Sequence, residues 1–293
     1  MVQEAIQAII DALSVGSLYA LLSLGIALVF GIMGLINFAH GELITLGGYV
    51  LVMSAAFPDP WRIIFVFVIC MLAALLMERV AFRPVRGAAA DTLLVTSFAV
   101  SFLMQSLAIL FLGALPKGAM ILPSFSQPIR FAGLAVRPLD VLTIVVTLVL
   151  LVGLVLFLRH TSIGVQMRAA AEKFEMARLL GVRANYVIAT AFAISGILAG
   201  IATVIVVAQT GLVGPMTGAS LVFAAFVATI VGGLGTLSGA VLGAYVLGII
   251  TVLLQVILPS ELRPYREAFV FTALVIILVF RPQGLLGTRR IRI

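Results

Sequence analysis

Nine apolar runs constrain this chain more than any other feature of its sequence. They lie at about 7–30, 43–57, 61–80, 92–113, 139–158, 186–208, 221–235, 238–258 and 266–280. About 20 apolar residues in a helix cross the roughly 30 Å hydrocarbon core of a bilayer, where backbone groups must be hydrogen-bonded internally. Because the runs are continuous, they exclude the alternating strands of a membrane barrel. The pattern predicts an all-α, polytopic helical membrane protein.

The composition excludes a soluble enzyme. Charged residues make up 10% of the 293 residues and hydrophobic residues make up 63%. A soluble domain carries about 25% charged residues, so this chain could not cover a globular surface with polar groups. No linker or low-complexity tract divides the sequence. We therefore expect residues 1–293 to form a single transmembrane domain.

The basic residues of alternate loops predict the orientation of the bundle. Twelve of the eighteen lie in one set of loops and the C-terminal tail, namely Arg79, Arg83, Arg86, Arg159, Arg168, Lys173, Arg178, Arg183, Arg281, Arg289, Arg290 and Arg292. The positive-inside rule puts this set, and the C-terminus, in the cytoplasm of a cell with an inner membrane. The basic-poor segment 115–138 would then be external.

The number of spans depends on the short run at 43–57. If this run crosses the membrane, the chain has nine spans and an external N-terminus. If the run is re-entrant, there are eight spans and the N-terminus is internal. The first ten residues contain no Lys or Arg, which favours the external N-terminus. Residues 221–258 are too long for one span, and their central glycines predict two crossings.

The sequence contains no signature of catalysis. A nucleotide-binding phosphate loop needs Gly-Lys-Ser/Thr, and neither Lys117 nor Lys173 stands in such a context. We predict no catalytic residue, no metal site and no cofactor, since Cys70 and two histidines leave too few ligands for a metal. The basic residues lie at membrane edges, which gives no support for nucleic-acid binding.

Two groups of polar residues are candidates for a substrate pathway. Asn37, His40 and Glu42 lie between the first two apolar runs, where uncompensated polar groups are costly. They could form a hydrogen-bonded turn at the cytoplasmic edge or take part directly in transport. A second group, Ser97, Ser101 and Gln105, has the i, i+4, i+8 spacing of one helical face. That stripe could contact the two ionic ends of a zwitterion, or it could form interhelical hydrogen bonds.

The loop at about 159–185 is the longest predicted cytoplasmic segment. Residues 168–180 have good helix formers and mixed charges, so we expect one amphipathic helix that ends at Gly181 as its C-cap. Glu172 and Glu175 would lie near Arg178 on that helix. The segment could be a solvated connector or the docking site for a partner.

Several motifs resemble a known transporter family. Glu175-Met176-Ala177-Arg178-Leu179-Leu180-Gly181 is similar to the Glu-Ala-Ala-three-residues-Gly core by which ABC importer permeases engage their ATPases, although Met176 replaces the second Ala and the final Leu-Pro is absent. A larger set resembles LivH-type permeases of branched-chain amino acid importers, namely Gly16–Leu21, Asn37–Glu42 with Gly47, Gly232–Ala240 and Phe280–Gly287. The resemblance covers residues 6 to 287.

The resemblance implies the permease subunit of an ATP-driven importer that moves branched-chain or other small hydrophobic amino acids across the inner membrane by alternating access and has no ATPase site of its own. Its partners would be membrane lipid, a second LivM-like permease, two ABC ATPase subunits and a periplasmic substrate-binding protein. Coupling residues would be Glu172, Glu175, Ala177, Arg178 and Gly181. Relatives of this family for urea or short amides remain open as alternatives. So does a proton-coupled secondary transporter that uses His40 and Glu42 as a relay.

Overall fold

The computed structural model describes residues 2–131, 134–281 and 283–286, and each apolar run corresponds to a helix in it. The nine helices that correspond to the apolar runs are α1 (Val2–Met33), α2 (His40–Met53), α3 (Asp59–Met77), α4 (Ala90–Leu112), α6 (Pro138–His160), α9 (Ala184–Thr210), α10 (Thr217–Gly232), α11 (Leu237–Ile257) and α12 (Arg266–Phe280). Residues 221–258, for which two crossings are predicted, contain two helices, because α10 and α11 are separated by a turn at 233–236.

Short elements connect these helices. They include a π-helical turn (Glu78–Phe82), α5 (Pro123–Ser126), α7 (Ser162–Glu172), α8 (Phe174–Leu179) and a 3-10 turn (Arg263–Tyr265). Strand β1 (Lys117–Gly118) pairs antiparallel with β4 (Leu212–Val213), and β2 (Ile129–Phe131) pairs antiparallel with β3 (Leu134–Val136). The fold is therefore helical, with two small strand pairs in its loops.

Six helices of the described residues are long and apolar enough to cross a membrane. They are Ile6–Met33, Asp59–Phe82, Ala90–Leu112, Pro138–His160, Ala184–Thr210 and Leu237–Ile257. Helices α2, α10 and α12 have 14, 16 and 15 residues, which is shorter than the roughly 20 residues of a full span. The prediction of eight or nine spans is therefore not confirmed by helix length, and it depends on these three helices.

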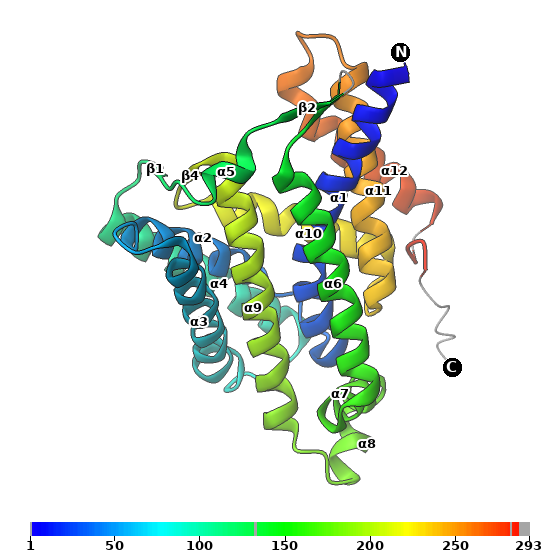
Figure 1. The fold of residues 1–293 in the computed structure, drawn as a ribbon. Coiled ribbons are helices and arrows are strands. Elements are labelled where there is room, and N and C mark those ends of the chain that lie inside the picture. Colours follow the sequence, from blue (N-terminus) through cyan, green and yellow to red (C-terminus); the bar gives the residue numbers. More distant parts are fainter. Residues whose placement is uncertain (1, 132–133, 282, 287–293) are drawn as a thin grey trace.

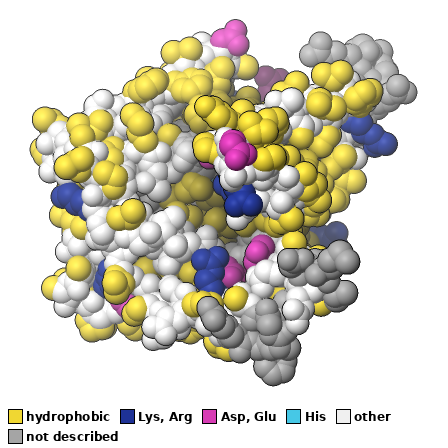
Figure 2. All heavy atoms as spheres, turned by 90° about the horizontal axis from the view of Figure 1, so that it is seen from above, with side chains coloured by type: hydrophobic (Ala, Val, Ile, Leu, Met, Phe, Trp, Pro, Cys, Tyr) yellow, Lys and Arg dark blue, Asp and Glu magenta, His cyan; other side chains and the backbone are white. Residues whose placement is uncertain are grey.

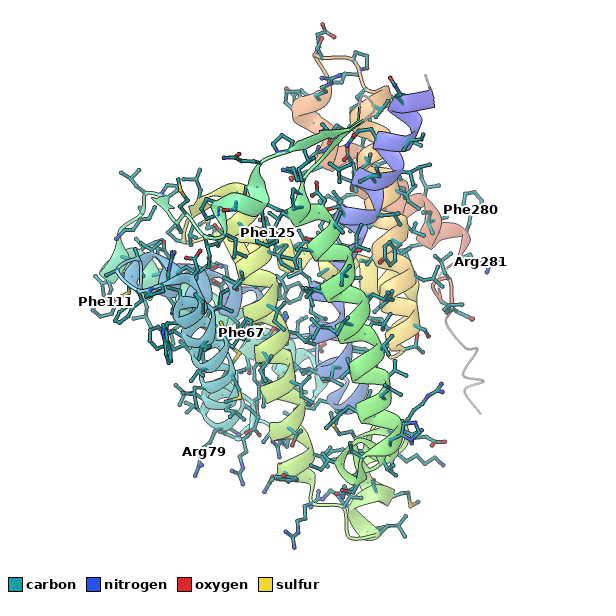
Figure 3. All side chains as sticks on the ribbon, viewed as in Figure 1. Phe67, Arg79, Phe111, Phe125, Phe280 and Arg281 are labelled. Atoms are coloured by element: carbon teal, nitrogen blue, oxygen red, sulfur yellow. The ribbon has the colours of Figure 1, made fainter. Side chains whose placement is uncertain are left out.

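The helices form a bundle whose connecting elements gather at its two ends (Figure 1). The N-terminus, β2 and α5 lie at one end, and α7 and α8 lie at the other, where Figure 3 also places Arg79. Figure 2 looks onto the N-terminal end, where charged side chains surround a hollow near the middle of the face. The basic 159–185 loop and the 115–138 segment therefore lie at opposite ends of the molecule.

Helices α1 and α9 form the centre of the bundle. In each of them 78% of the apolar window is buried, against 22% in α4 and α6. The outer faces of α4 and α6 are apolar and exposed, as is typical of helices that contact lipid or a second membrane subunit.

Glycines allow the central helices to approach one another closely. Gly41 of α2 and Gly218 of α10 touch through their backbones, and a Cβ at Gly218 would overlap the Gly41 carbonyl oxygen. Gly16 of α1 faces Gly248 and Tyr245 of α11 in the same way, with Ser17 Oγ 2.9 Å from Tyr245 Oη. Small residues at such positions are typical of helix packing in membranes.

The C-terminal segment covers the end of α10. The Leu285 amide donates to the Val231 carbonyl at 2.8 Å, and the Leu286 amide donates to the Gly232 carbonyl at 3.0 Å. These bonds satisfy two of the carbonyls that a helix leaves without partners at its C-terminus. The motifs at 232–240 and 280–287 are thus neighbours in space, although Gly287, Arg289, Arg290 and Arg292 lie outside the described residues.

Gly218→Ala is expected to lower the free energy of unfolding of the purified permease by about 1–3 kcal/mol, because the added methyl group meets the α2 backbone. The matched control is Gly153→Ala in α6, where no atom lies within 4 Å of the added Cβ. That control should be neutral or slightly stabilising, since Ala favours helix over Gly. Equal effects of the two substitutions on a denaturant unfolding curve would contradict the proposed packing.

Candidate functional site

The helical break between α1 and α2 places polar residues inside the bundle. Residues 34–39 are non-helical, and Asn37 and His40 are 4% and 2% exposed. His40 Nδ1 lies 3.1 Å from Ser195 Oγ of α9. It also packs against Gly25 of α1, which lies eight residues before the end of that helix and therefore roughly 12 Å from its end. His40 therefore lies inside the bundle rather than at the end of α1, because the chain turns back into the bundle before α2 begins.

The hydrogen bonds of His40 leave one ring nitrogen unused. Ser195 Oγ donates its hydrogen to the Gly25 carbonyl at 3.2 Å, so it accepts from His40 Nδ1. His40 Nε2 is then a buried acceptor, and it has no partner. Gly25 has no side chain, and a Cβ there would lie 2.8 Å from Nε2. The absence of a side chain on α1 thus makes room for the imidazole.

Glu42 joins the two groups of predicted pathway residues. Its Oε1 accepts from Ser101 Oγ at 2.8 Å and from Gln105 Nε2 at 2.7 Å, and the residue is 1% exposed. Gln105 Nε2 also lies 3.2 Å from Ser101 Oγ. Ser97, by contrast, donates to the Leu94 carbonyl of its own helix. Two of the three α4 residues, Ser101 and Gln105, therefore bond the α2 carboxylate, whereas Ser97 does not contribute to this group.

Four buried polar atoms of this region lack hydrogen-bond partners. They are Asn37 Oδ1, His40 Nε2, Glu42 Oε2 and Tyr49 Oη. An unsatisfied buried polar group costs about 1–3 kcal/mol, and in a membrane such groups mark functional sites. The described residues contain no cluster of three His, Cys, Asp or Glu that could hold a metal ion. The free atoms are therefore available to a polar organic solute or to water.

An apolar cavity of about 240 Å³ adjoins the Glu42 carboxylate between α2 and α4. Glu42, Thr45 and Tyr49 line it from α2, and Met104 and Leu107 are among its apolar residues on α4. Ligand sites typically combine apolar walls with a few polar groups that fix orientation. The surface of this cavity is almost entirely apolar, and the Glu42 carboxylate lies beside it rather than in its wall.

A second cavity, of about 340 Å³, lies between α1, α10, α11 and α12. Arg266 and Glu267 line it together with apolar side chains that include Phe223. Phe223 packs against Phe38 of the break, with ring centroids 5.2 Å apart. Sequence reasoning missed this site. The available signal was the adjacent pair of opposite charges at the start of the last apolar run.

The predicted coupling helix is divided into two helices. Helix α7 ends at Glu172, Lys173 is extended (φ −147°, ψ 93°), and α8 begins at Phe174. The expectation of one helix over 168–180 is wrong, because Phe174 and Ala177 turn into the core and this burial outweighs local helix propensity. Gly181 has the left-handed φ of 89° that its role as a C-cap predicts.

The exposed side of α8 combines charged and apolar residues. Glu175 and Arg178 are exposed, and Met176, Leu179 and Leu180 are 58%, 82% and 87% exposed. Glu172, also exposed, and Glu175 make no ion pair with Arg178. Exposed apolar residues next to charges are typical of a protein interaction site.

A basic groove of about 670 Å³ adjoins α8, with Arg83, Arg86, Arg178 and Arg183 in its lining. Arg86 donates to Glu78 and to Asn185 Oδ1. Burial lowers the pKa of Arg86, while the Glu78 carboxylate acts in the opposite direction. Three guanidinium groups of the groove are therefore left without a partner inside the described chain.

Comparisons with known proteins identify the family. A family model described as branched-chain amino acid transport system / permease component matches residues 8–279. The chain belongs to this permease family. It is 32% identical to the high-affinity branched-chain amino acid transport system permease protein BraD of Pseudomonas aeruginosa, over 96% of this chain and 95% of the relative.

Two further relatives extend this comparison. The permease protein LivH of Escherichia coli K12 is 31% identical, over 96% of this chain and 95% of its own. The autoinducer 2 import system permease protein LsrC of Yersinia enterocolitica is 33% identical over 132 residues, which is 43% of this chain and 35% of that protein. No solved structure matches. The predicted resemblance to LivH-type permeases is confirmed.

A double-mutant cycle tests the link between α2 and α4. Glu42→Ala and Gln105→Ala are expected to show a coupling free energy of about 1 kcal/mol, because each removes the same buried hydrogen bond. Glu42→Ala combined with Ser97→Ala should be additive within about 0.5 kcal/mol, since the Ser97 hydroxyl bonds within its own helix. Unfolding free energies of the purified variants provide the measurement. An additive Glu42–Gln105 pair would contradict the observed geometry.

Proposed function

We propose that this chain is the permease subunit of an ATP-driven importer for branched-chain or other small hydrophobic amino acids. It would act by alternating access in a bacterial inner membrane. The observation that carries the proposal is the match of nearly the whole chain to branched-chain amino acid permeases. Partial identity to an import system permease supports the direction of transport.

The solute route would pass the break between α1 and α2. An amino-acid zwitterion needs polar partners for its two ionic ends and an apolar wall for its side chain. Asn37 and His40 offer unpartnered atoms, and Glu42 with Ser101 and Gln105 offers a polar group beside an apolar cavity. The Arg266–Glu267 cavity would receive the zwitterion from the N-terminal end, since its Phe223 wall reaches Phe38.

The orientation follows from the positive-inside rule. The end that holds α7, α8 and Arg79 would face the cytoplasm, together with the C-terminus (Figure 1). The 115–138 segment and the N-terminus would face the opposite side. If α2, α10 and α12 complete the crossings with the help of shielding neighbours, the chain has nine passes.

The coupling element would be the exposed face of α8. A permease without a phosphate-binding loop needs a rigid element that receives the conformational change of an ATPase. Glu175 and Arg178 are exposed for docking, Ala177 is buried and fixes α8 to the core, and Gly181 sets the angle to α9. Glu172 lies at the end of α7. The partners would be two ABC ATPase subunits, a LivM-like permease and a periplasmic substrate-binding protein.

A urea or short-amide permease of the same type remains the nearest alternative. LsrC, which matches part of this chain, is named as a permease for autoinducer 2 import, so similar permeases are named for different solutes. A proton-coupled transporter would need a relay between His40 and Glu42. No hydrogen bond joins these two side chains, and His40 bonds Ser195 whereas Glu42 bonds α4. The ATP-driven function therefore has the stronger support.

Uptake by the reconstituted complex tests the route. Asn37→Ala and His40→Ala are expected to reduce leucine uptake about ten-fold, which corresponds to about 1.4 kcal/mol of lost stabilisation, while the complex stays assembled. Thr96→Ala is the control, because that exposed hydroxyl bonds only the Thr92 carbonyl. If uptake falls only in proportion to the yield of assembled complex, the segment has a structural role and no direct role in transport. Uptake of urea or short amides alone by the wild-type complex would refute the proposed substrate class.

Coupling is tested by substrate-stimulated ATP hydrolysis. Gly181→Val should abolish or strongly reduce stimulation, because any Cβ at a φ of 89° costs about 1 kcal/mol or more and shifts α8. Glu175→Arg should weaken ATPase attachment by reversing a charge on the docking face. Gly87→Val is the control, since Gly87 has the same φ of 89° in another loop. If both the Gly181→Val and the Glu175→Arg variants keep the wild-type level of substrate-stimulated ATP hydrolysis and of co-purified ATPase, this loop is not the coupling element.

A further inference from the structure

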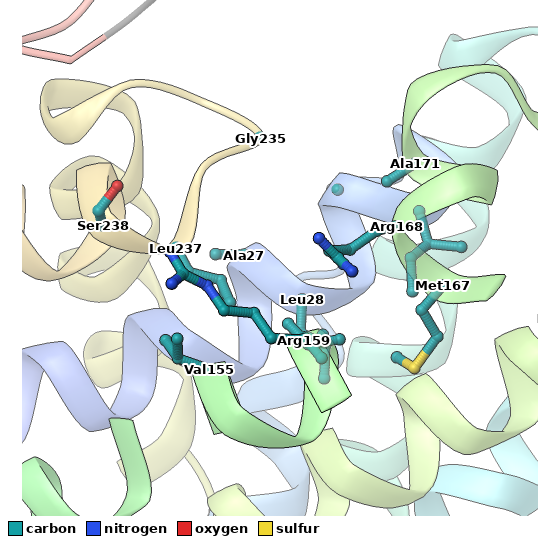
Figure 4. A pocket seen from close by; sticks show the side chains of 13 residues that line it. Ala27, Leu28, Val155, Arg159, Met167, Arg168, Ala171, Gly235, Leu237 and Ser238 are labelled. Atoms are coloured by element: carbon teal, nitrogen blue, oxygen red, sulfur yellow. The ribbon is translucent and has the colours of Figure 1, made fainter. Parts of the chain in front are cut away.

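A cavity of about 380 Å³ lies at the α7 end of the bundle (Figure 4). Its walls come from the end of α1, the last turns of α6, the middle of α7 and the turn between α10 and α11. Neither the transport route nor the exposed face of α8 includes it.

Two arginines point into this cavity without a partner. Arg159 stands in the last turn of α6 and Arg168 stands in α7, and Figure 4 shows both side chains directed into the open space. Neither guanidinium makes an ion pair or a hydrogen bond with any described residue. No acidic residue lines the cavity. Two like charges that share a cavity repel one another, so a bound anion would stabilise this arrangement.

The donors of the cavity suit a phosphate group. A guanidinium is a planar fork of N–H donors that matches phosphate oxygens, and it stays charged at every physiological pH. Ser238 adds a hydroxyl at the second position of α11, where a helix N-terminus also favours an anion. The cavity is therefore lined by two guanidinium groups and one hydroxyl.

The position and the apolar wall indicate the source of that phosphate. Arg159 is the penultimate residue of the candidate span Pro138–His160, so in a bilayer its guanidinium would lie at the depth of the lipid head groups. Leu28, Ile32 and Leu158 line the same cavity and offer an apolar surface to glycerol and the first acyl carbons. Basic pockets between membrane helices on the cytoplasmic side are known to bind anionic head groups.

We infer that this cavity binds an anionic phosphate group, and that the phosphate belongs to a membrane phospholipid. Inorganic phosphate offers the same charge and oxygen atoms without the acyl chains. A lipid held there would tie the end of α6 to α7, the first helix of the 159–185 loop. The inference stands independently of the transported solute.

Native mass spectrometry of the complex, purified in mild detergent from membranes that contain phosphatidylglycerol, tests this inference. Wild-type complex should retain phosphatidylglycerol in preference to a zwitterionic lipid. Arg159→Gln with Arg168→Gln should lower that retention about ten-fold or more, since each basic residue near the membrane surface contributes to anionic-lipid affinity. Arg79→Gln with Lys173→Gln is the matched control, because it removes two charges from the same end of the bundle and neither residue lines this cavity or the basic groove beside α8.

Each outcome decides one part of the inference. Retention that survives in the Arg159/Arg168 variant, or falls equally in the control, would overturn the site. Retention restored in part by Arg159→Lys with Arg168→Lys would support charge recognition and show that the double variant folds. In a lipid-depleted sample, binding of inorganic phosphate that depends on these arginines, without any enrichment of phosphatidylglycerol, would support the anion site and reject the lipid as its source.

Discussion

The break between α1 and α2 is the constraint around which this bundle is organised. A non-helical segment that turns back into an apolar interior brings backbone and side-chain polar groups into a medium that cannot hydrate them. The neighbouring helices supply the partners. Ser195 of α9 bonds His40, while Ser101 and Gln105 of α4 bond Glu42. Two other helices, α4 and α9, thus supply hydrogen-bond partners to a site that α1 and α2 create.

The residues around the break differ in side-chain size, and this difference determines how closely the neighbouring helices pack against it. Phe38, within the break, packs against three other aromatic rings, with centroids 4.4 Å from Phe98, 5.2 Å from Phe223 and 5.1 Å from Phe226. Gly41 follows it and allows α10 to approach. Aromatic rings therefore pack around Phe38 of the break. Close to it, the absence of a side chain on Gly41 lets α10 contact the backbone of α2. Under the proposed alternating access, a tightly packed shell of this kind would limit the break to a few discrete arrangements.

Apolar length and periodicity were sufficient to predict every long helix, because in a membrane protein these features reflect burial in lipid and in protein at once. The α4 stripe was also predictable, since an i, i+4, i+8 spacing puts Ser101 and Gln105 on one face. The contact of that face with Glu42 was not, because it depends on the angle at which α2 re-enters the bundle. The division at Lys173 was missed for a similar reason: the burial of Phe174 against distant helices has no local signature.

The central claim is that the Asn37–Glu42 segment is part of a solute route whose accessibility changes during transport. The most direct measurement is the reaction rate of Asn37→Cys, in a Cys70→Ala background, with a small polar thiol reagent. The rate would be compared between nucleotide-free and ATP-bound complexes. The account predicts a rate that changes with nucleotide state and falls when leucine is supplied, whereas Ser23→Cys, which replaces a fully buried hydroxyl bonded to the Ala225 carbonyl, stays unreactive. A cysteine at position 37 that is as unreactive as the one at position 23 in every state would contradict it.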